Sequence, residues 1–128
     1  MKRHIGCRVW AFPDGDLPPT GGAEPFGHES LILLNPSRSA ARISITVYFE
    51  EREPERDILL TLGGERVCSV RLDQPLGERG FVIPQGQYAL MVESTEPIVA
   101  QIGRMDVRQP NLAYYTVLGF AVDGEPAT

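Results

Sequence analysis

The chain has 128 residues, a formal net charge of −5, 42% hydrophobic residues and 23% charged residues. A domain of this size can bury a core without metal or disulfide staples. The negative charge disfavours nucleic acid and anionic membranes as partners, because its field repels phosphate.

The two cysteines, Cys7 and Cys68, lack the spacing of metal ligands, so no metal or cofactor is expected. Free thiols are favoured over a disulfide between them. The opening segment MKRHIGCRVW is basic but has no apolar stretch typical of a signal peptide. No apolar run approaches the roughly 20 residues of a membrane helix. We therefore expect one cytoplasmic domain over 1–128.

Apolar and polar residues alternate along most of the chain, which predicts β-strands. In ARISITVYFE, at 41–50, Ile43, Ile45 and Val47 share one face. Similar runs predict further strands at 5–12, 28–35, 57–62, 66–72, 87–94, 97–106 and 111–122. The turn residues NPSRSA between 28–35 and 41–50 predict a hairpin over 28–50.

Glycine (13) and proline (11) are spread along the chain and break most windows long enough for a helix. About eight strands at this spacing predict an all-β sandwich or barrel. The Pro- and Gly-rich segment 13–27 is expected to be a long loop, either functional or a partly disordered excursion. The tail at 123–128 is expected to fray.

The segment QIGRMDVRQPN, at 101–111, carries the most unusual pattern. Side chains two apart share a strand face, so the apolar row through Ile102 continues into Arg104, Asp106 and Arg108. Buried guanidinium groups are costly unless they are paired, and Asp106 is a natural partner for both arginines. Gln101, Gln109 and Asn111 add polar groups nearby.

Three interpretations of this row stay open. It can form the polar floor of a ligand cavity, since guanidinium forks match carboxylates and hydroxyls. It can form an ion network between subunits. It can also be a strand end that emerges into solvent.

Other polar or aromatic residues are candidates for the same cluster. His28 and Glu29 begin a strand after the long loop, but neighbours in a strand point to opposite faces and cannot form a dyad. Arg71 either joins the cluster or lies at the surface, and Trp10 is either a core anchor or a ring for ligand stacking. The sequence has no G-x-S-x-G, P-loop or H-E-x-x-H motif.

Several short motifs follow one another along the chain. They are Trp10-Ala11, HES at 28–30, ILLN at 32–35, ITVYF at 45–49, EP at 53–54, VR at 70–71, IP at 83–84, EPIVAQ at 96–101 and RMDVRQ at 104–109. In this order they resemble the sensory rhodopsin transducer family, small soluble bacterial proteins named for the partner of one microbial rhodopsin. The resemblance covers about residues 5 to 120.

The resemblance implies an antiparallel jelly-roll-like β-sandwich that assembles as a homotetramer. It also implies a small-molecule site, suited to sugars or related metabolites. Carried onto this chain, the site draws on Trp10, His28, Glu29, Arg71, Gln101, Arg104, Asp106 and Arg108.

The sequence and the resemblance together favour a non-enzymatic sensory domain that binds a sugar- or carboxylate-like metabolite. Two alternatives remain. One is a signalling adaptor that binds a rhodopsin-like membrane receptor without any ligand. The other is a sugar-acting enzyme, which requires His28, Glu29 and Asp106 to converge within hydrogen-bond reach.

Overall fold

The computed structural model describes residues 5–122, which form eight strands and no helix. The strands are β1 (Cys7–Leu17), β2 (His28–Asn35), β3 (Ala41–Tyr48), β4 (Glu55–Leu62), β5 (Arg66–Arg71), β6 (Gly86–Asp106), β7 (Ala113–Leu118) and β8 (Phe120–Val122). All pairings between them are antiparallel. The predicted all-β sandwich of about eight strands is confirmed.

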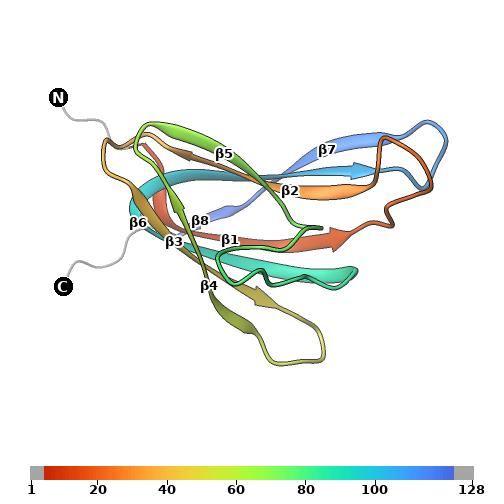
Figure 1. The fold of residues 1–128 in the computed structure, drawn as a ribbon, viewed down its shortest axis with the longest axis horizontal. Helices are drawn as coiled ribbons and strands as arrows, with labels where there is room; N and C mark the ends of the chain where they lie inside the picture. The colour runs from red at the N-terminus through yellow and green to blue at the C-terminus, as the bar shows by residue number, and fades with distance from the viewer. Residues whose placement is uncertain (1–4, 123–128) are drawn as a thin grey trace.

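The strands form two layers that share β6 (Figure 1). Sheet A has the order β4-β3-β6-β1-β8, and sheet B has the order β5-β2-β6-β7. The first half of β6 pairs with β1 and β3, whereas residues from Val99 onward pair with β2 and β7. The sequence predicted two strands, at 87–94 and 97–106, where one 21-residue strand passes from one sheet to the other.

The predicted hairpin over 28–50 is wrong. β2 lies in sheet B and β3 lies in sheet A, so the connection between them crosses the sandwich. Asn35 explains the crossing, because its fully buried side-chain amide donates hydrogen bonds to the carbonyls of Ser39, Leu62 and Gly63 at 2.8, 3.2 and 3.1 Å. Its carbonyl oxygen accepts from the N–H of Ser37 at 3.1 Å. The turn residues were recognised correctly, but they serve a crossover rather than a hairpin.

Two other boundaries differ from expectation. β1 continues to Leu17, so the long connection begins at residue 18 rather than 13. The predicted strand at 111–122 divides into β7 and β8 at Gly119, where the ring of Phe12 lies 2.6 Å from the position that a Cβ would take. The chain can pass this close to the core only without a side chain. The tail predicted to fray, 123–128, lies outside the described residues.

The core lies between the sheets and follows the predicted alternation. Ile43, Ile45 and Val47 of β3 are fully buried, as are Ile98 and Ile102 of β6. Each such side chain contributes about 1.5–3 kcal/mol through burial. Cys7 and Cys68 are free and partly buried, which agrees with the prediction.

Candidate functional site

The row of side chains at the end of β6 turns inward at first and then reaches the surface. Ile98, Ala100 and Ile102 are 0–3% exposed, and Arg104, on the same face, is 7% exposed. Asp106 is half-buried at the last residue of the strand, and Arg108 is exposed in the loop that follows. The row was expected to continue the inward face, and it does so through Arg104.

The partner of Arg104 is Glu29, not Asp106. In sheet B the two residues lie directly opposite each other on β2 and β6, and the Arg104 Nε donates to Glu29 Oε2. The Glu29 side chain is fully buried, and that of Arg104 is 9% exposed. A buried ion pair of this kind is tolerated only when further hydrogen bonds satisfy both groups.

Those further bonds are present on the Glu29 carboxylate. The Tyr88 hydroxyl donates to Glu29 Oε1 at 2.5 Å, and the backbone N–H of Asp16 lies 3.1 and 3.3 Å from the two carboxylate oxygens. Tyr88 is 2% exposed, and burial together with the neighbouring Glu29 charge raises the pKa of its hydroxyl. Tyr88 therefore stays a neutral donor.

The local sequence of β1 permits this arrangement. The pairing of β1 with β6 shifts register between Phe12 and Gly15. The ring of Tyr88 lies 2.5 Å from the position that a Cβ on Gly15 would take, so only glycine leaves room for it. The shift and the glycine together bring the Asp16 N–H to the carboxylate.

Both terminal nitrogens of Arg104 also donate hydrogen bonds. Nη1 donates to the Tyr115 hydroxyl at 2.9 Å, and Nη2 donates to the backbone carbonyl of Asp14 at 3.0 Å. The guanidinium carbon lies 5.3 Å from the centre of the Tyr115 ring. Burial acts to lower the pKa of Arg104, but the hydrogen bonds to Tyr115 and Glu29 outweigh it and leave the pKa raised. The network thus ties β1, β2, β6 and β7 together.

A separate pair lies beyond the strand end. Arg108 donates from Nε to both oxygens of Asp106 at 3.0 and 3.1 Å, and from Nη2 at 2.5 Å. Its backbone N–H also donates to Asp106 Oδ1 at 3.0 Å. These hydrogen bonds, first from the side chain and then from the backbone, lower the pKa of Asp106 to about 2.

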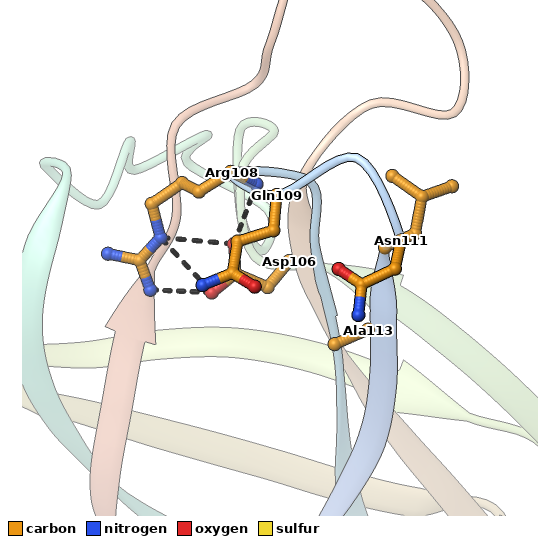
Figure 2. Close-up of a pocket in the computed structure, with 6 residues that line it drawn as sticks. Asp106, Arg108, Gln109, Asn111 and Ala113 are labelled. Carbon is orange, nitrogen blue, oxygen red and sulfur yellow. Dashed lines mark hydrogen bonds and ion pairs between the residues drawn. The ribbon is translucent and has the colours of Figure 1, made fainter.

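The Asp106–Arg108 pair lines a cavity of about 490 Å³ in the β6–β7 hairpin. Gln109, Asn111, Leu112 and Ala113 complete its lining. Figure 2 shows Gln109 beside the ion pair and Asn111 across from it, on the arm that leads into β7. The volume is within the range of small-molecule sites, which is about 300–1,000 Å³.

Several polar groups at this cavity have no partner among the described residues. The Nη1 of Arg108 and the side-chain amides of Gln109 and Asn111 make no hydrogen bond within 5–122. Together they offer donors in a planar fork and two groups that both donate and accept. This set matches a carboxylate or a polyhydroxylated molecule.

The connection 18–27 packs against the same hairpin. Ideal Cβ positions on Gly21 and Gly27 lie 2.9 and 3.3 Å from Val107 Cγ2, so both glycines contact the loop between β6 and β7. In Figure 1 this connection and the β6–β7 loop lie at the same end of the sandwich. The connection and the β6–β7 loop are therefore in direct contact.

The structure does not bring the other candidates to this cavity. Arg71 forms a two-bond ion pair with Asp73, with both distances 2.7 Å. His28 Nδ1 lies 2.8 Å from the carbonyl oxygen of Phe26, which can only accept, so Nδ1 carries the proton. Gln101 lies on the outer face of sheet B, opposite Ile32 and Leu118.

Trp10 is a partly buried core anchor at a distance from the hairpin. Its indole N–H lies 3.1 and 2.9 Å from the carbonyl oxygens of Cys7 and Ile98. Ile98 precedes Asp106 by eight residues, or about 26 Å of extended strand. Of the two alternatives for this residue, the structure agrees with the core anchor.

The convergence that the sugar-acting enzyme alternative requires is not found among the described residues. No hydrogen bond joins any two of His28, Glu29 and Asp106 within 5–122, since each has other partners. No group of three or more potential metal ligands occurs among the described residues. A search of the same residues for a helix long and apolar enough to cross a membrane found none.

Sequence reasoning missed Tyr88 and Tyr115. Tyr88 shares its face with Leu90 and Val92, and all three are at most 2% exposed. A tyrosine at an inward position of an apolar row needs a buried hydrogen-bond partner, which is a usable signal. Nothing comparable marks Tyr115, because β7 is largely exposed.

Two comparisons with known proteins point to one family. Residues 5–121 match the family model described as Anabaena sensory rhodopsin transducer. A comparison with curated proteins finds no match. Among solved structures, Thermotoga maritima 1070 superposes with a TM-score of 0.81 at 30% identity, covering 95% of this chain and all of that chain. The Anabaena sensory rhodopsin transducer superposes with a TM-score of 0.70 at 35% identity, covering 84% of this chain and 95% of that one.

Proposed function

Since the chain belongs to the Anabaena sensory rhodopsin transducer family, we propose that it is a non-enzymatic sensory domain that binds a sugar- or carboxylate-like metabolite in the β6–β7 hairpin. The observation that carries this proposal is the 490 Å³ cavity with its unpartnered polar groups. Arg108, Gln109 and Asn111 contact the ligand, and Asp106 orients Arg108 and accepts from ligand hydroxyls.

Arg104 and Glu29 take a different role from the one first expected. Their hydrogen bonds are directed at each other and at Tyr88 and Tyr115, so they position the hairpin rather than contact the ligand. Ligand binding is read out through the 18–27 connection, which contacts Val107. A ligand shifts the equilibrium between two conformations of this connection by its difference in affinity for them. The protein works in the cytoplasm as a homotetramer.

A thermal-shift screen tests the ligand. The panel contains neutral sugars, sugar acids and small hydroxycarboxylates, each added to the full chain. A ligand at 100 times its Kd adds about 2.7 kcal/mol to the free energy of unfolding. A panel in which no compound raises the Tm contradicts the proposal.

Two variants locate the binding site. Arg108→Ala should abolish the ligand-induced shift, and Asn111→Ala should reduce it. Arg42→Ala is the matched control, because Arg42, on β3 of sheet A, is also an exposed arginine and forms a two-bond ion pair with Glu78. A ligand that still shifts the Tm of Arg108→Ala binds elsewhere.

A second candidate function follows from the family. One solved relative is a sensory rhodopsin transducer, which favours an adaptor that binds a membrane receptor without ligand. Co-purification with a membrane-embedded receptor from solubilised membranes, unchanged in Arg108→Ala, would favour this function over ligand sensing.

A further inference from the structure

A second cavity, of about 190 Å³, lies where β3 ends and β6 begins. In Figure 1 the start of β6 lies between the ends of β1 and β3, which are its neighbours in sheet A. Ala89 of β6 and Tyr48 of β3 lie directly opposite each other. Both are on the outer face of this sheet, because the adjacent Leu90 and Val47 are buried in the core. The cavity is therefore separate from the β6–β7 hairpin, which belongs to sheet B.

A bulge in β1 opens this cavity. The pairing of β1 with β6 shifts register between Phe12 and Gly15. Within the shift, Pro13 and Asp14 of β1 together oppose Ala89 of β6. Such a bulge bends the strand and redirects its side chains, and bulges of this kind are common beside binding sites. Ala89 has only a methyl side chain, so it forms the floor of a recess between the two neighbouring strands.

Aromatic residues make up most of the lining. Tyr48, Phe49 and Tyr88 line the cavity together with Pro13. Tyr88 is held in place, because its hydroxyl donates to the buried Glu29 carboxylate at 2.5 Å. The face of an aromatic ring is electron-rich and attracts cations. The lining is thus suited to a positively charged group that also has apolar surface.

The same aromatic cluster already holds one cation of the chain itself. The guanidinium carbon of Arg52 lies 4.5 Å from the centre of the Phe49 ring. Arg52 also donates from Nη2 to Glu55 Oε1 at 3.2 Å, and this carboxylate offsets its charge. The repulsion between Arg52 and a second cation in the cavity is therefore weakened.

The polar groups of the cavity favour a cation over the other ligand classes. Apart from tyrosine, its polar lining residues among those described are Glu50 and Gln87, and no Arg, Lys or His lines it. The exposed carboxylate of Glu50 forms no ion pair within 5–122. An anion would be repelled by this carboxylate, and a polyhydroxylated molecule would find too few hydrogen-bond partners. A cation matches both Glu50 and the net charge of −5.

We propose that this recess binds a small organic cation of the quaternary ammonium class. Its methyl groups contact the aromatic residues and its charge lies near Glu50. Aromatic cages recognise quaternary ammonium groups in this way. A water molecule takes up about 30 Å³ of liquid, so the cavity of about 190 Å³ has room for about six groups of that size, close to a choline molecule. The inference goes beyond the function proposed above and does not depend on the ligand of the hairpin.

Titration of choline chloride into the full ¹⁵N-labelled chain tests the proposal. Choline chloride replaces sodium chloride, so that the ionic strength stays constant. The backbone amide signals of Glu50, Gln87 and Ala89 should shift and reach saturation. The uncharged alcohol in which carbon replaces the ammonium nitrogen should bind at least about fivefold more weakly. The absence of saturable shifts at these amides overturns the proposal, as does equal binding of the two compounds.

Two variants at neighbouring positions test the role of the carboxylate. Glu50→Gln should weaken choline binding about two- to fivefold, because an exposed charge pair contributes little more than this. Glu51→Gln is the matched control, since Glu51 is an exposed carboxylate that does not line the cavity. It causes the same change in net charge and should leave the Kd unchanged. Equal weakening by both variants would assign the effect to the overall negative charge and overturn the site.

Two further variants test the walls of the cavity without changing any charge. Tyr48→Leu keeps an apolar side chain but removes an aromatic face, and it should weaken binding about fivefold. Tyr48 is 37% exposed, so little packing within the chain is lost. Ala89→Val fills the floor of the recess and should abolish the shifts. Far-UV circular dichroism checks that each variant stays folded, and a folded Ala89→Val chain with the wild-type Kd contradicts the proposal.

Discussion

Two ion pairs stand side by side at the end of β6, and their surroundings give them different roles. The Glu29 and Arg104 side chains are 0% and 9% exposed, whereas those of Asp106 and Arg108 are 17% and 58% exposed. The first pair uses its donors and acceptors within the protein, and the second leaves Nη1 of Arg108 without a described partner. The same kind of ion pair thus stabilises the fold at Glu29 and Arg104, where solvent is excluded. At Asp106 and Arg108, two residues further along the chain, it is available for binding.

The largest effect is expected when the buried carboxylate of the first pair is removed. Glu29→Ala leaves Arg104 buried without its charge partner, which costs about 3–5 kcal/mol in the free energy of unfolding. Urea denaturation of the variant and of the wild type measures the difference.

Two further variants complete that experiment. Glu78→Ala breaks the exposed pair with Arg42 and should change stability very little, because water replaces the lost contact. The double variant E29L/R104M should recover most of the loss, since it leaves no buried charge unpaired. Equal effects of Glu29→Ala and Glu78→Ala would show that the buried pair is not structural.

A smaller effect on the free energy of unfolding is expected from the two tyrosines of the network, and it should differ between them. Tyr88→Phe removes the hydroxyl that donates to Glu29 in a buried setting and should cost about 1–3 kcal/mol. Tyr115→Phe removes the hydroxyl that accepts from Arg104, but Tyr115 is 42% exposed, so water can take its place and the loss should be smaller. Chemical denaturation of both variants gives the order, and the reverse order would contradict the network described for Glu29.

Part of this site could be predicted from one strand alone. The period of two along 98–104 places Arg104 on the inward face, and its 7% exposure confirms that placement. The same pattern, together with the absence of helix signals, predicted the all-β fold. These features depend on local alternation, which a single sequence displays.

The partner of Arg104 could not be predicted in the same way. Glu29 lies 75 positions away, on a strand whose register with β6 is decided by packing rather than by either strand alone. The crossing between β2 and β3 escaped prediction for a related reason. The turn residues are visible in the sequence, but the three carbonyl groups that accept hydrogen bonds from Asn35 are brought together only by folding.

The smallest effect concerns the exposed pair and is a shift in a titration. The pKa of Asp106 is lowered to about 2 in the folded chain, against about 3.9 for an ordinary aspartate. The stability that this pair contributes is therefore present above pH 3.9 and is lost as the pH falls through 2.

Carboxyl ¹³C NMR should show a midpoint near pH 2 for Asp106. In Arg108→Ala the midpoint should rise only part of the way to 3.9, because the backbone N–H of residue 108 still donates to Oδ1. A wild-type midpoint near pH 4 would mean that Asp106 does not hold the Arg108 side chain in place. The hairpin cavity would then have no guanidinium group in a fixed orientation.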